Sequence, residues 1–344
     1  MDNQILARLP QVLPAWYSSN KRDLPWRQDK DPYHIWLSEI MLQQTRVEAV
    51  KGYYSRFLQA LPTIEALANA DDELLHKLWE GLGYYSRVRN LKKAARVIVD
   101  AYGGQFPGEY EKVLALPGIG AYTAGAVCSI AFNQKTPAVD GNVLRLYSRL
   151  MLDETAVDLP EMKKRVNEEL CAVYPDQAGD FTQALMELGA TVCGPNRAPA
   201  CESCPCKDFC LAHKHHKTDA VPVRLPKKER RQEDKTVFIL TCGDLLAIRK
   251  RPETGLLAGL WEFPNVPGRL DPAGAVQAIT DMGLKVENIE KTVERKNIFT
   301  HIQWNMRGVY ISVKESSGDL TWLSTDEIRS SAALPTAFRQ FLEA

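Results

Sequence analysis

The spacing of hydrophobic residues changes from helix-like to strand-like near residue 220. From the start of the chain to about Cys210, apolar residues recur at spacings of three and four, for example over residues 35–42 and 74–79. This is the spacing of one face of an amphipathic helix. Asp71 and Asp72 precede the second run and predict a capped helix start. We therefore expect the N-terminal part to be all-α.

A different pattern follows. Residues 221–234 combine prolines with charged residues, which is typical of a linker. Three later runs, rich in β-branched and large apolar residues, predict strands at residues 236–240, 245–248 and 309–313. Between them, residues 272–282 predict a helix that ends at Gly283. The expected organisation is an all-α domain over residues 1–220, the linker over 221–234 and a smaller α/β domain over 235–344.

Composition changes this picture little. A chain of 344 residues suits two domains. The 43 basic and 43 acidic residues balance, so charge gives none of the basic excess that most DNA-binding proteins carry. No apolar run is long enough for a membrane helix, and Met1–Gln4 does not open a secretory signal. We expect a cytoplasmic protein without membrane association.

Eight cysteines are present, and the cluster between residues 193 and 210 is the strongest sign of a metal centre. Cys193, Cys201, Cys204 and Cys210 are separated by seven, two and five residues. Thiolate-only ligation selects zinc or an iron–sulfur cluster. One short pair with two longer arms favours iron–sulfur over zinc, whose sites usually pair two short spacings. Cys206 is a further thiol that either replaces one of these four as a metal ligand or does not bind the metal.

The segment Leu116–Gly125 places two glycines, Gly118 and Gly120, between two helical patterns. Such a hairpin points backbone N–H groups outward, and the helix that follows adds its N-terminal dipole. The segment is therefore either a phosphate-binding hairpin or an ordinary turn between helices.

Two carboxylates are candidates for chemistry. Asp140 follows an apolar run and precedes Gly141, so it either caps a helix or faces a sugar whose phosphate the hairpin holds. The two roles are compatible. Glu39 shares one face of a predicted helix with Gln43, beside the apolar Trp36. It is either an acid with a raised pKa or an exposed helix glutamate.

Several stretches together resemble the MutY family of adenine DNA glycosylases, within the helix-hairpin-helix, iron–sulfur superfamily. The resemblance extends over nearly the whole chain, and its signatures are residues 24–27, 38–45, 80–87, 138–142 and 256–264 together with the four-cysteine loop. It implies a six-helix module over about residues 26–133. It also implies an iron–sulfur module built from residues 1–25 and 134–220, and a MutT/Nudix-like domain at the C-terminus.

The resemblance implies a reaction. Glu39 would be the general acid and base, and Asp140 would stabilise or trap the sugar cation, with Tyr122 and Asn142 beside it. Relatives similar to endonuclease III have a lysine at the position of Tyr122 and form a Schiff base with it. A tyrosine cannot do so, which predicts a monofunctional glycosylase without strong lyase activity.

The resemblance also assigns binding residues. Those implied for the adenine are Arg22, Trp26 and Gln183, and those implied for DNA are Gln43, Gln44, Thr45, Tyr84, Gly118 and Gly120. In the C-terminal domain, Phe299, Thr300 and His301 look like the family's Phe-Ser-His loop that recognises 8-oxoguanine, with threonine in place of serine. The alternative for this segment is an ordinary turn between strands. The helix at residues 272–282 lacks the glutamates that hold magnesium in Nudix hydrolases, so this domain is expected to bind rather than hydrolyse.

The implied cofactor is a 4Fe–4S cluster on Cys193, Cys201, Cys204 and Cys210, although the first gap is seven residues where the family usually has six. The implied partner is duplex DNA with adenine opposite 8-oxoguanine or guanine, bound by a monomer at the nucleoid of a bacterial cell. A glycosylase for another mismatch, a non-catalytic DNA-binding protein and a nucleotide hydrolase are the competing hypotheses.

Overall fold

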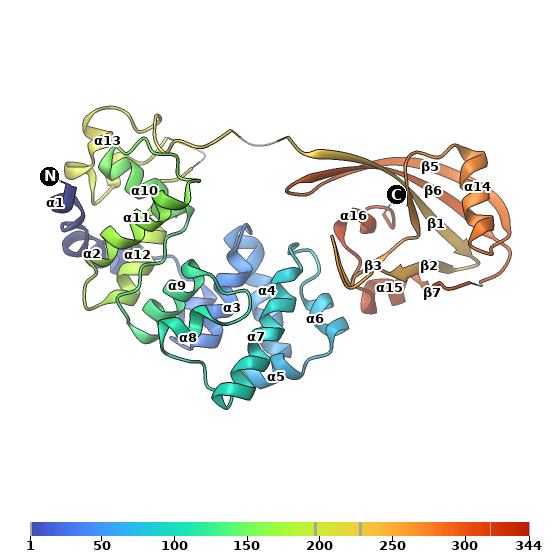
Figure 1. The fold of residues 1–344 in the computed structure, drawn as a ribbon, viewed down its shortest axis with the longest axis horizontal. Helices are drawn as coiled ribbons and strands as arrows, with labels where there is room; N and C mark the ends of the chain where they lie inside the picture. The colour runs from blue at the N-terminus through green and yellow to red at the C-terminus, as the bar shows by residue number, and fades with distance from the viewer. Residues whose placement is uncertain (1, 196–197, 227–228, 317, 344) are drawn as a thin grey trace. The chain divides into compact units, whose positions relative to one another are not determined.

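The computed structural model describes residues 2–343 apart from 196–197, 227–228 and 317. It divides into two compact units, of which the first comprises residues 1–69 and 89–226 and the second residues 70–88 and 227–344 (Figure 1). Each unit has its own packed interior.

The first unit is helical, as the spacing of apolar residues predicts. Its longer helices are α2 (Leu9–Asn20), α3 (Pro32–Leu42), α4 (Val47–Ala60), α7 (Ser86–Tyr102, which begins in the second unit), α9 (Ala121–Phe132), α10 (Gly141–Met151), α11 (Pro160–Cys171) and α12 (Ala178–Thr191). The shorter ones are α1 (Asp2–Leu6), α5 (Ile64–Asn69), α8 (Tyr110–Leu114) and α13 (Leu211–Lys214), with 3₁₀ turns η1 (Pro25–Arg27), η2 (Cys201–Ser203) and η3 (Lys207–Phe209). Within the described part of this unit no strand occurs.

One core of this unit joins the start of the chain to the region of the cysteines. Leu9, Leu13 and Tyr17 recur every four residues on α2 and are buried. They pack in one cluster with residues of α10, α11 and α12 and with Cys206. Each large apolar side chain buried in this way contributes about 1.5–3 kcal/mol. Helix α2 therefore covers the helices from which much of the site described below is built.

The expected hairpin lies between α8 and α9. Gly118 has φ +76°, and a Cβ added there would lie 2.5 Å from Cβ of Asn90. Both the backbone conformation and the close approach require glycine at this position. Gly120 is the N-cap of α9. The backbone thus has the tight turn and helix N-terminus that a phosphate-binding hairpin needs.

The second unit contains a mixed sheet with the path β3-β2-β1-β6-β5, on which β4 pairs with β1 and β7 with β2. The strands are β1 (Arg231–Cys242), β2 (Leu245–Lys250), β3 (Trp261–Glu262), β4 (Asn265–Pro267), β5 (Val286–Ile298), β6 (Ile302–Val313) and β7 (Thr321–Ser324). Strands β1 and β6 are parallel from Arg231 opposite Ile302 onward. Because this pairing begins so early, residues 231–234 form a strand where the sequence predicts linker.

Both faces of this sheet are covered. Along β1, Val237 and Ile239 belong to one core and Phe238 and Leu240 to the other. The first core contains residues of α15 (Thr325–Ser331) and α16 (Thr336–Arg339), and the second contains residues of α14 (Pro272–Asp281). The predicted α/β domain is therefore confirmed, and the α14 segment ends before Gly283, whose φ is +80°.

Helix α6 (Asp72–Leu78) belongs to the second unit. Its predicted cap is confirmed, because the Asp71 carboxylate accepts from the backbone N–H groups of Glu73 and Leu74. Glu73 in turn accepts a 3.0 Å hydrogen bond from the indole of Trp261, which ties α6 to the sheet. Throughout the described residues, no helix has the length and apolar character that a bilayer span requires.

Candidate active site and cysteine pocket

A pocket of about 620 Å³ lies in the first unit, within the size range of small-molecule sites. It is formed by η1, the end of α3, the starts of α9 and α10, and α12. Most residues that the sequence predicts for catalysis, adenine binding and the adjoining DNA contact line it: Arg22, Trp26, Glu39, Gln43, Gln44, Thr45, Tyr122, Asp140, Asn142 and Gln183. Helices distant in sequence thus bring the predicted groups to one cavity.

Glu39 lies on α3 and is only 6% exposed. The hydroxyl of Tyr122 donates a 2.5 Å hydrogen bond to its Oε2. Burial raises the pKa of Glu39 to about 7, although the Tyr122 hydrogen bond opposes the rise. A carboxyl with such a pKa holds and releases a proton near neutral pH, as a general acid and base must.

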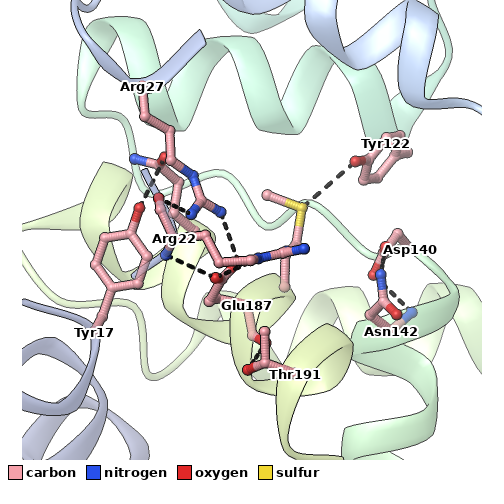
Figure 2. Close-up of polar contacts among 10 residues, drawn as sticks. Tyr17, Arg22, Arg27, Tyr122, Asp140, Asn142, Glu187 and Thr191 are labelled. Atoms are coloured by element: carbon pink, nitrogen blue, oxygen red, sulfur yellow. Dashed lines mark hydrogen bonds and ion pairs between the residues drawn. The ribbon is translucent and has the colours of Figure 1, made fainter. Parts of the chain in front are cut away.

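Asp140 is the N-cap of α10, as one of its two predicted roles requires. One carboxylate oxygen accepts from the backbone N–H groups of Asn142 and Val143, at 2.9 and 2.8 Å. The other accepts from the Asn142 side chain at 2.7 Å (Figure 2). Burial raises the pKa of Asp140, whereas these hydrogen bonds oppose the rise. The carboxylate is therefore fixed in orientation at the pocket wall.

Asn142 is itself held in place by Arg145. Its amide oxygen accepts a 2.8 Å hydrogen bond from Arg145, one turn further along α10. Arg145 is buried and also donates to the carbonyls of Gly189 and Cys193, each at 2.7 Å. Because the arginine engages its oxygen, Asn142 turns its NH₂ group toward Asp140.

Glu187 is a site residue that the sequence-based prediction missed. It is fully buried on α12 and forms ion pairs with Arg22 at 2.7 Å and Arg27 at 2.8 Å (Figure 2). Burial alone would raise its pKa, but the two arginines hold the pKa of Glu187 at about 2. The available signal was a charged residue between Met186 and Leu188 in an apolar helix.

The predicted base-binding residues lie beside this ion-pair network. Gln183 accepts a 3.0 Å hydrogen bond from the Tyr17 hydroxyl through Oε1, which fixes its amide and presents Nε2 as a donor. Trp26 is buried and packs edge-on against Tyr54, with ring centroids 5.6 Å apart. The pocket therefore combines an aromatic wall with oriented donors.

The prediction that Glu39 and Gln43 share one helical face was wrong. Helix α3 ends at Leu42, and Gln43 leaves it with ψ 111°. Gln44 then adopts the left-handed region at φ +57°. Gln43 still faces the pocket, where its amide lies 3.4 Å from the hydroxyl of Thr123.

The five cysteines of the predicted metal region line a second, smaller pocket beside α10: Cys193, Cys201, Cys204, Cys206 and Cys210. Arg149 anchors two of them, because its guanidinium donates to Sγ of Cys193 at 3.2 Å and its carbonyl accepts from Sγ of Cys210 at 3.4 Å. Within the described residues, no three His, Cys, Asp or Glu side chains stand close enough together to hold a metal ion. The thiols thus share a pocket without a closed coordination geometry.

Comparison with known proteins decides the family. Residues 37–173 match the HhH-GPD superfamily of base excision DNA repair proteins, and residues 236–344 match the NUDIX domain. The adenine DNA glycosylase of Rattus norvegicus is 35% identical over 95% of this chain and 76% of its own. The human adenine DNA glycosylase is 34% identical over 95% of this chain and 72% of its own. The chain belongs to the adenine DNA glycosylase family.

Membership of this family makes the chain a DNA N-glycosylase of base excision repair. A solved thymine-DNA glycosylase matches with a TM-score of 0.56 and 30% identity, over 62% of this chain and 98% of that one. The predicted fold, helix-hairpin-helix glycosylase followed by a Nudix-like domain, is confirmed.

Within the second unit of this glycosylase, two predicted DNA-contacting residues meet. The hydroxyls of Tyr84 and Thr300 lie 2.9 Å apart. Tyr84 is 46% exposed and has φ +49°. Phe299 packs edge-on against Trp304 with centroids 4.8 Å apart, and the carbonyl of His301 accepts from the backbone N–H of Arg231 at 3.0 Å. The loop between β5 and β6 is thereby fixed at both ends.

Proposed function

We propose that this glycosylase removes adenine mispaired with 8-oxoguanine or guanine in duplex DNA, with Glu39 as general acid and base and Asp140 as stabiliser of the sugar cation. The observation that supports it is a difference between two carboxyls of one pocket. Glu39 has a pKa of about 7 and accepts one hydrogen bond, whereas Asp140 accepts three hydrogen bonds, which fix its orientation and favour its ionised form against the effect of burial. In such a pair, one carboxyl acts as the acid and the other stabilises positive charge.

The proposed reaction begins with an adenine flipped into the pocket. Protonated Glu39 donates its proton to N7, the C1′–N9 bond breaks, and the bonding electron pair leaves with the base. The sugar keeps the positive charge, which the Asp140 carboxylate faces. Glu39, now ionised, accepts a proton from water as the water oxygen bonds to C1′. This returns Glu39 to its starting state.

Recognition of the base is assigned to the pocket wall that η1 and α12 contribute. Gln183 offers its amide to the base edge and Trp26 offers an aromatic surface. Glu187 holds the guanidinium of Arg22 at this wall through a two-point ion pair. An adenine edge then meets donors whose directions are set before binding.

Tyr122 makes the proposed enzyme monofunctional, since a phenol forms no Schiff base with the sugar. Treatment of an enzyme–DNA reaction with borohydride tests this directly. We expect almost no trapped covalent complex, and trapping as efficient as that of a lysine-dependent lyase would contradict the assignment.

The cofactor proposed is a 4Fe–4S cluster on Cys193, Cys201, Cys204 and Cys210. Support comes from the donor set, because five thiols line this pocket, with His213 as a further lining residue, and two of the thiols are anchored on Arg149. When bound, such a cluster supplies a rigid cross-link among the loops that carry its ligands. Iron and labile sulfide analysis of freshly purified protein tests it, and zinc in place of iron would refute it.

Single-turnover cleavage of three duplexes tests the specificity: adenine opposite 8-oxoguanine, adenine opposite guanine, and thymine opposite guanine. We expect excision of adenine from the first two and no reaction with the third. Glu39→Gln should abolish excision while duplex affinity stays near wild type. Glu168→Gln, at an exposed position on α11, is the matched control and should leave excision unchanged. Efficient thymine release would refute the specificity, and near-normal activity of Glu39→Gln would refute the acid.

A further inference from the structure

Tyr17 is a buried residue of the N-terminal helix that contacts one of the proposed base-binding side chains. It lies on α2, is 3% exposed and packs in one core cluster with Phe181 and Leu185 of α12. Its hydroxyl donates a 3.0 Å hydrogen bond to Oε1 of Gln183, 166 residues further along the chain. Among the described residues that line the active-site pocket, Gln183 is present and Tyr17 is not. Tyr17 therefore acts on the pocket through Gln183.

The phenol of Tyr17 is fixed in place and stays protonated. The guanidinium carbon of Arg27 lies over its ring, 5.5 Å from the ring centroid, and Nζ of Lys21 lies 5.6 Å from the same centroid. Burial raises the pKa of Tyr17 to about 12, although Arg27 opposes the rise. The hydroxyl thus keeps its proton at neutral and moderately alkaline pH and remains a hydrogen-bond donor.

This hydrogen bond decides which end of the Gln183 amide faces the pocket. A carboxamide accepts through its oxygen and donates through its nitrogen. With Oε1 turned toward the phenol, Nε2 is the atom left for the pocket, and it has no hydrogen-bond acceptor among the described residues. Half a turn of the amide would leave the buried phenolic hydrogen without its present acceptor, which is unfavourable. Gln183 thus presents a donor to the pocket.

We propose that Tyr17 is a positioning residue for base recognition, which makes Gln183 donate to an acceptor nitrogen in the six-membered ring of adenine. The proposal rests on the proposed excision of adenine and deepens it. N7 is assigned to the proton of Glu39, and the 6-amino group is itself a donor, so N1 and N3 remain as acceptors. Guanine carries a hydrogen on N1 and an amino group beside N3. A fixed donor therefore opposes guanine at either position.

Deaza analogues of adenine measure this contact. In 1-deazaadenine and 3-deazaadenine, a C–H group replaces N1 or N3 while N7 remains. Each analogue is placed opposite 8-oxoguanine, and its single-turnover excision rate is divided by that of adenine for the same enzyme. The intrinsic effect of the analogue on bond breakage is common to all variants, so it cancels when these ratios are compared. With one of the two analogues, we expect the wild-type ratio to be about tenfold lower than that of Gln183→Leu.

Tyr17→Phe removes the hydroxyl and keeps the packed ring. We expect its ratio for that analogue to rise by about threefold or more, toward that of Gln183→Leu, because the amide no longer holds Nε2 toward the base. Tyr17→Phe added to Gln183→Leu should change the ratio no further, since the tyrosine acts through the glutamine. Duplex affinity should stay near wild type in each variant.

Tyr174→Phe is the matched control. Its hydroxyl is also buried in the core of the first unit and lies 2.8 Å from the hydroxyl of Thr182, which precedes Gln183 on α12. Among the described residues that line the pocket, neither Tyr174 nor Thr182 occurs, so the ratio should keep its wild-type value.

Three results would overturn the proposal. They are equal ratios in Tyr17→Phe and wild type, an equal rise in Tyr174→Phe, and a wild-type ratio that matches Gln183→Leu for both analogues. Each of these leaves the excision of adenine itself intact. Wild-type protein that fails to excise adenine would instead overturn the proposed function, so the two failures are distinguishable.

Discussion

The guanidinium of Arg145 donates a 2.8 Å hydrogen bond to the amide oxygen of Asn142, while the amide nitrogen of the same asparagine donates to Asp140 at 2.7 Å. The arginine thus acts on the proposed sugar-facing carboxylate through one intermediate side chain. It also donates to the carbonyl of Cys193, in the segment that leads into the cysteine loop. Orientation of the carboxylate is therefore tied to the position of that loop.

Arg145→Gln should disturb the positioning of Asp140 without weakening the binding of duplex DNA. The variant removes a buried charge that contacts four oxygens, so Asn142 is free to rotate and Asp140 loses its fixed partner. We expect the single-turnover excision rate to fall by about 10–100-fold while duplex affinity changes little. Arg145→Lys should restore only part of the rate, because a lysine cannot reach the four acceptors together. Unchanged excision in Arg145→Gln would contradict the positioning role.

The pH dependence of excision should follow Glu39. The acid must be protonated to act, and burial places its pKa at about 7. The single-turnover rate should therefore fall as pH rises through about 7. Duplex affinity measured over the same pH range is the control, since Glu39 is not assigned to the DNA backbone. A rate that stays constant from neutral to alkaline pH would exclude Glu39 as the acid.

Glu39→Gln should stabilise the protein at alkaline pH. Because the folded pKa of Glu39 lies above its ordinary value of 4.5, the folded state binds the proton more tightly than the unfolded state. Stability from this group is present below pH 4.5 and is lost as pH rises through about 7. The neutral glutamine avoids that loss, by about 3 kcal/mol at most. Denaturant unfolding at pH 5 and pH 8 measures it, and a variant less stable than wild type at pH 8 would contradict it.

Glu187→Gln should have the opposite effect. Removing the buried carboxylate leaves Arg22 and Arg27 facing each other without their shared anion. We expect a loss of about 3–5 kcal/mol in the free energy of unfolding, together with slower excision. Glu168→Gln is the control, because Glu168 pairs with Lys164 at 3.9 Å with both side chains exposed, and exposed pairs contribute little. Equal stability of the two variants would show that the ion-pair network is dispensable.

Thr300→Ala should reduce the preference for 8-oxoguanine over guanine as the base opposite adenine. The variant removes the hydroxyl that meets Tyr84 at 2.9 Å. We expect the ratio of excision rates for adenine opposite 8-oxoguanine and opposite guanine to fall, since the loop loses the group that contacts Tyr84. Thr300→Ser, which keeps the hydroxyl, should preserve the ratio. An unchanged ratio in Thr300→Ala would remove this loop from damage recognition.

Local signals in the sequence predicted much of the fold. Helical spacing, the cap at Asp71 and the glycine after α14 correspond to the observed elements, because each depends on residues close together in the chain. Asp140 was open to two interpretations, and its capping role is now established. Local pattern singled out the two carboxyls of this pocket as candidates, each with a structural alternative, and the family resemblance assigned their roles.

What the sequence missed depends on contacts between distant segments. Residues 231–234 look like linker, and only pairing with β6 makes them a strand. Helix α3 ends at Leu42 although the residues after it are compatible with helix, because the chain turns there into the pocket wall. Glu187 can be recognised as a site residue only from its ion pairs with Arg22 and Arg27, about 160 residues away. No local pattern reports such partners.

The left-handed backbone at Gln44 and Tyr84 has a consequence for laboratory evolution. A non-glycine residue in that region costs on the order of 1–3 kcal/mol, which glycine avoids. A screen that rewards heat resistance alone would therefore favour glycine at both positions. It would enrich the two substitutions that remove side chains for which the family resemblance implies DNA contact, so selection for robustness and selection for repair act in opposite directions at these sites.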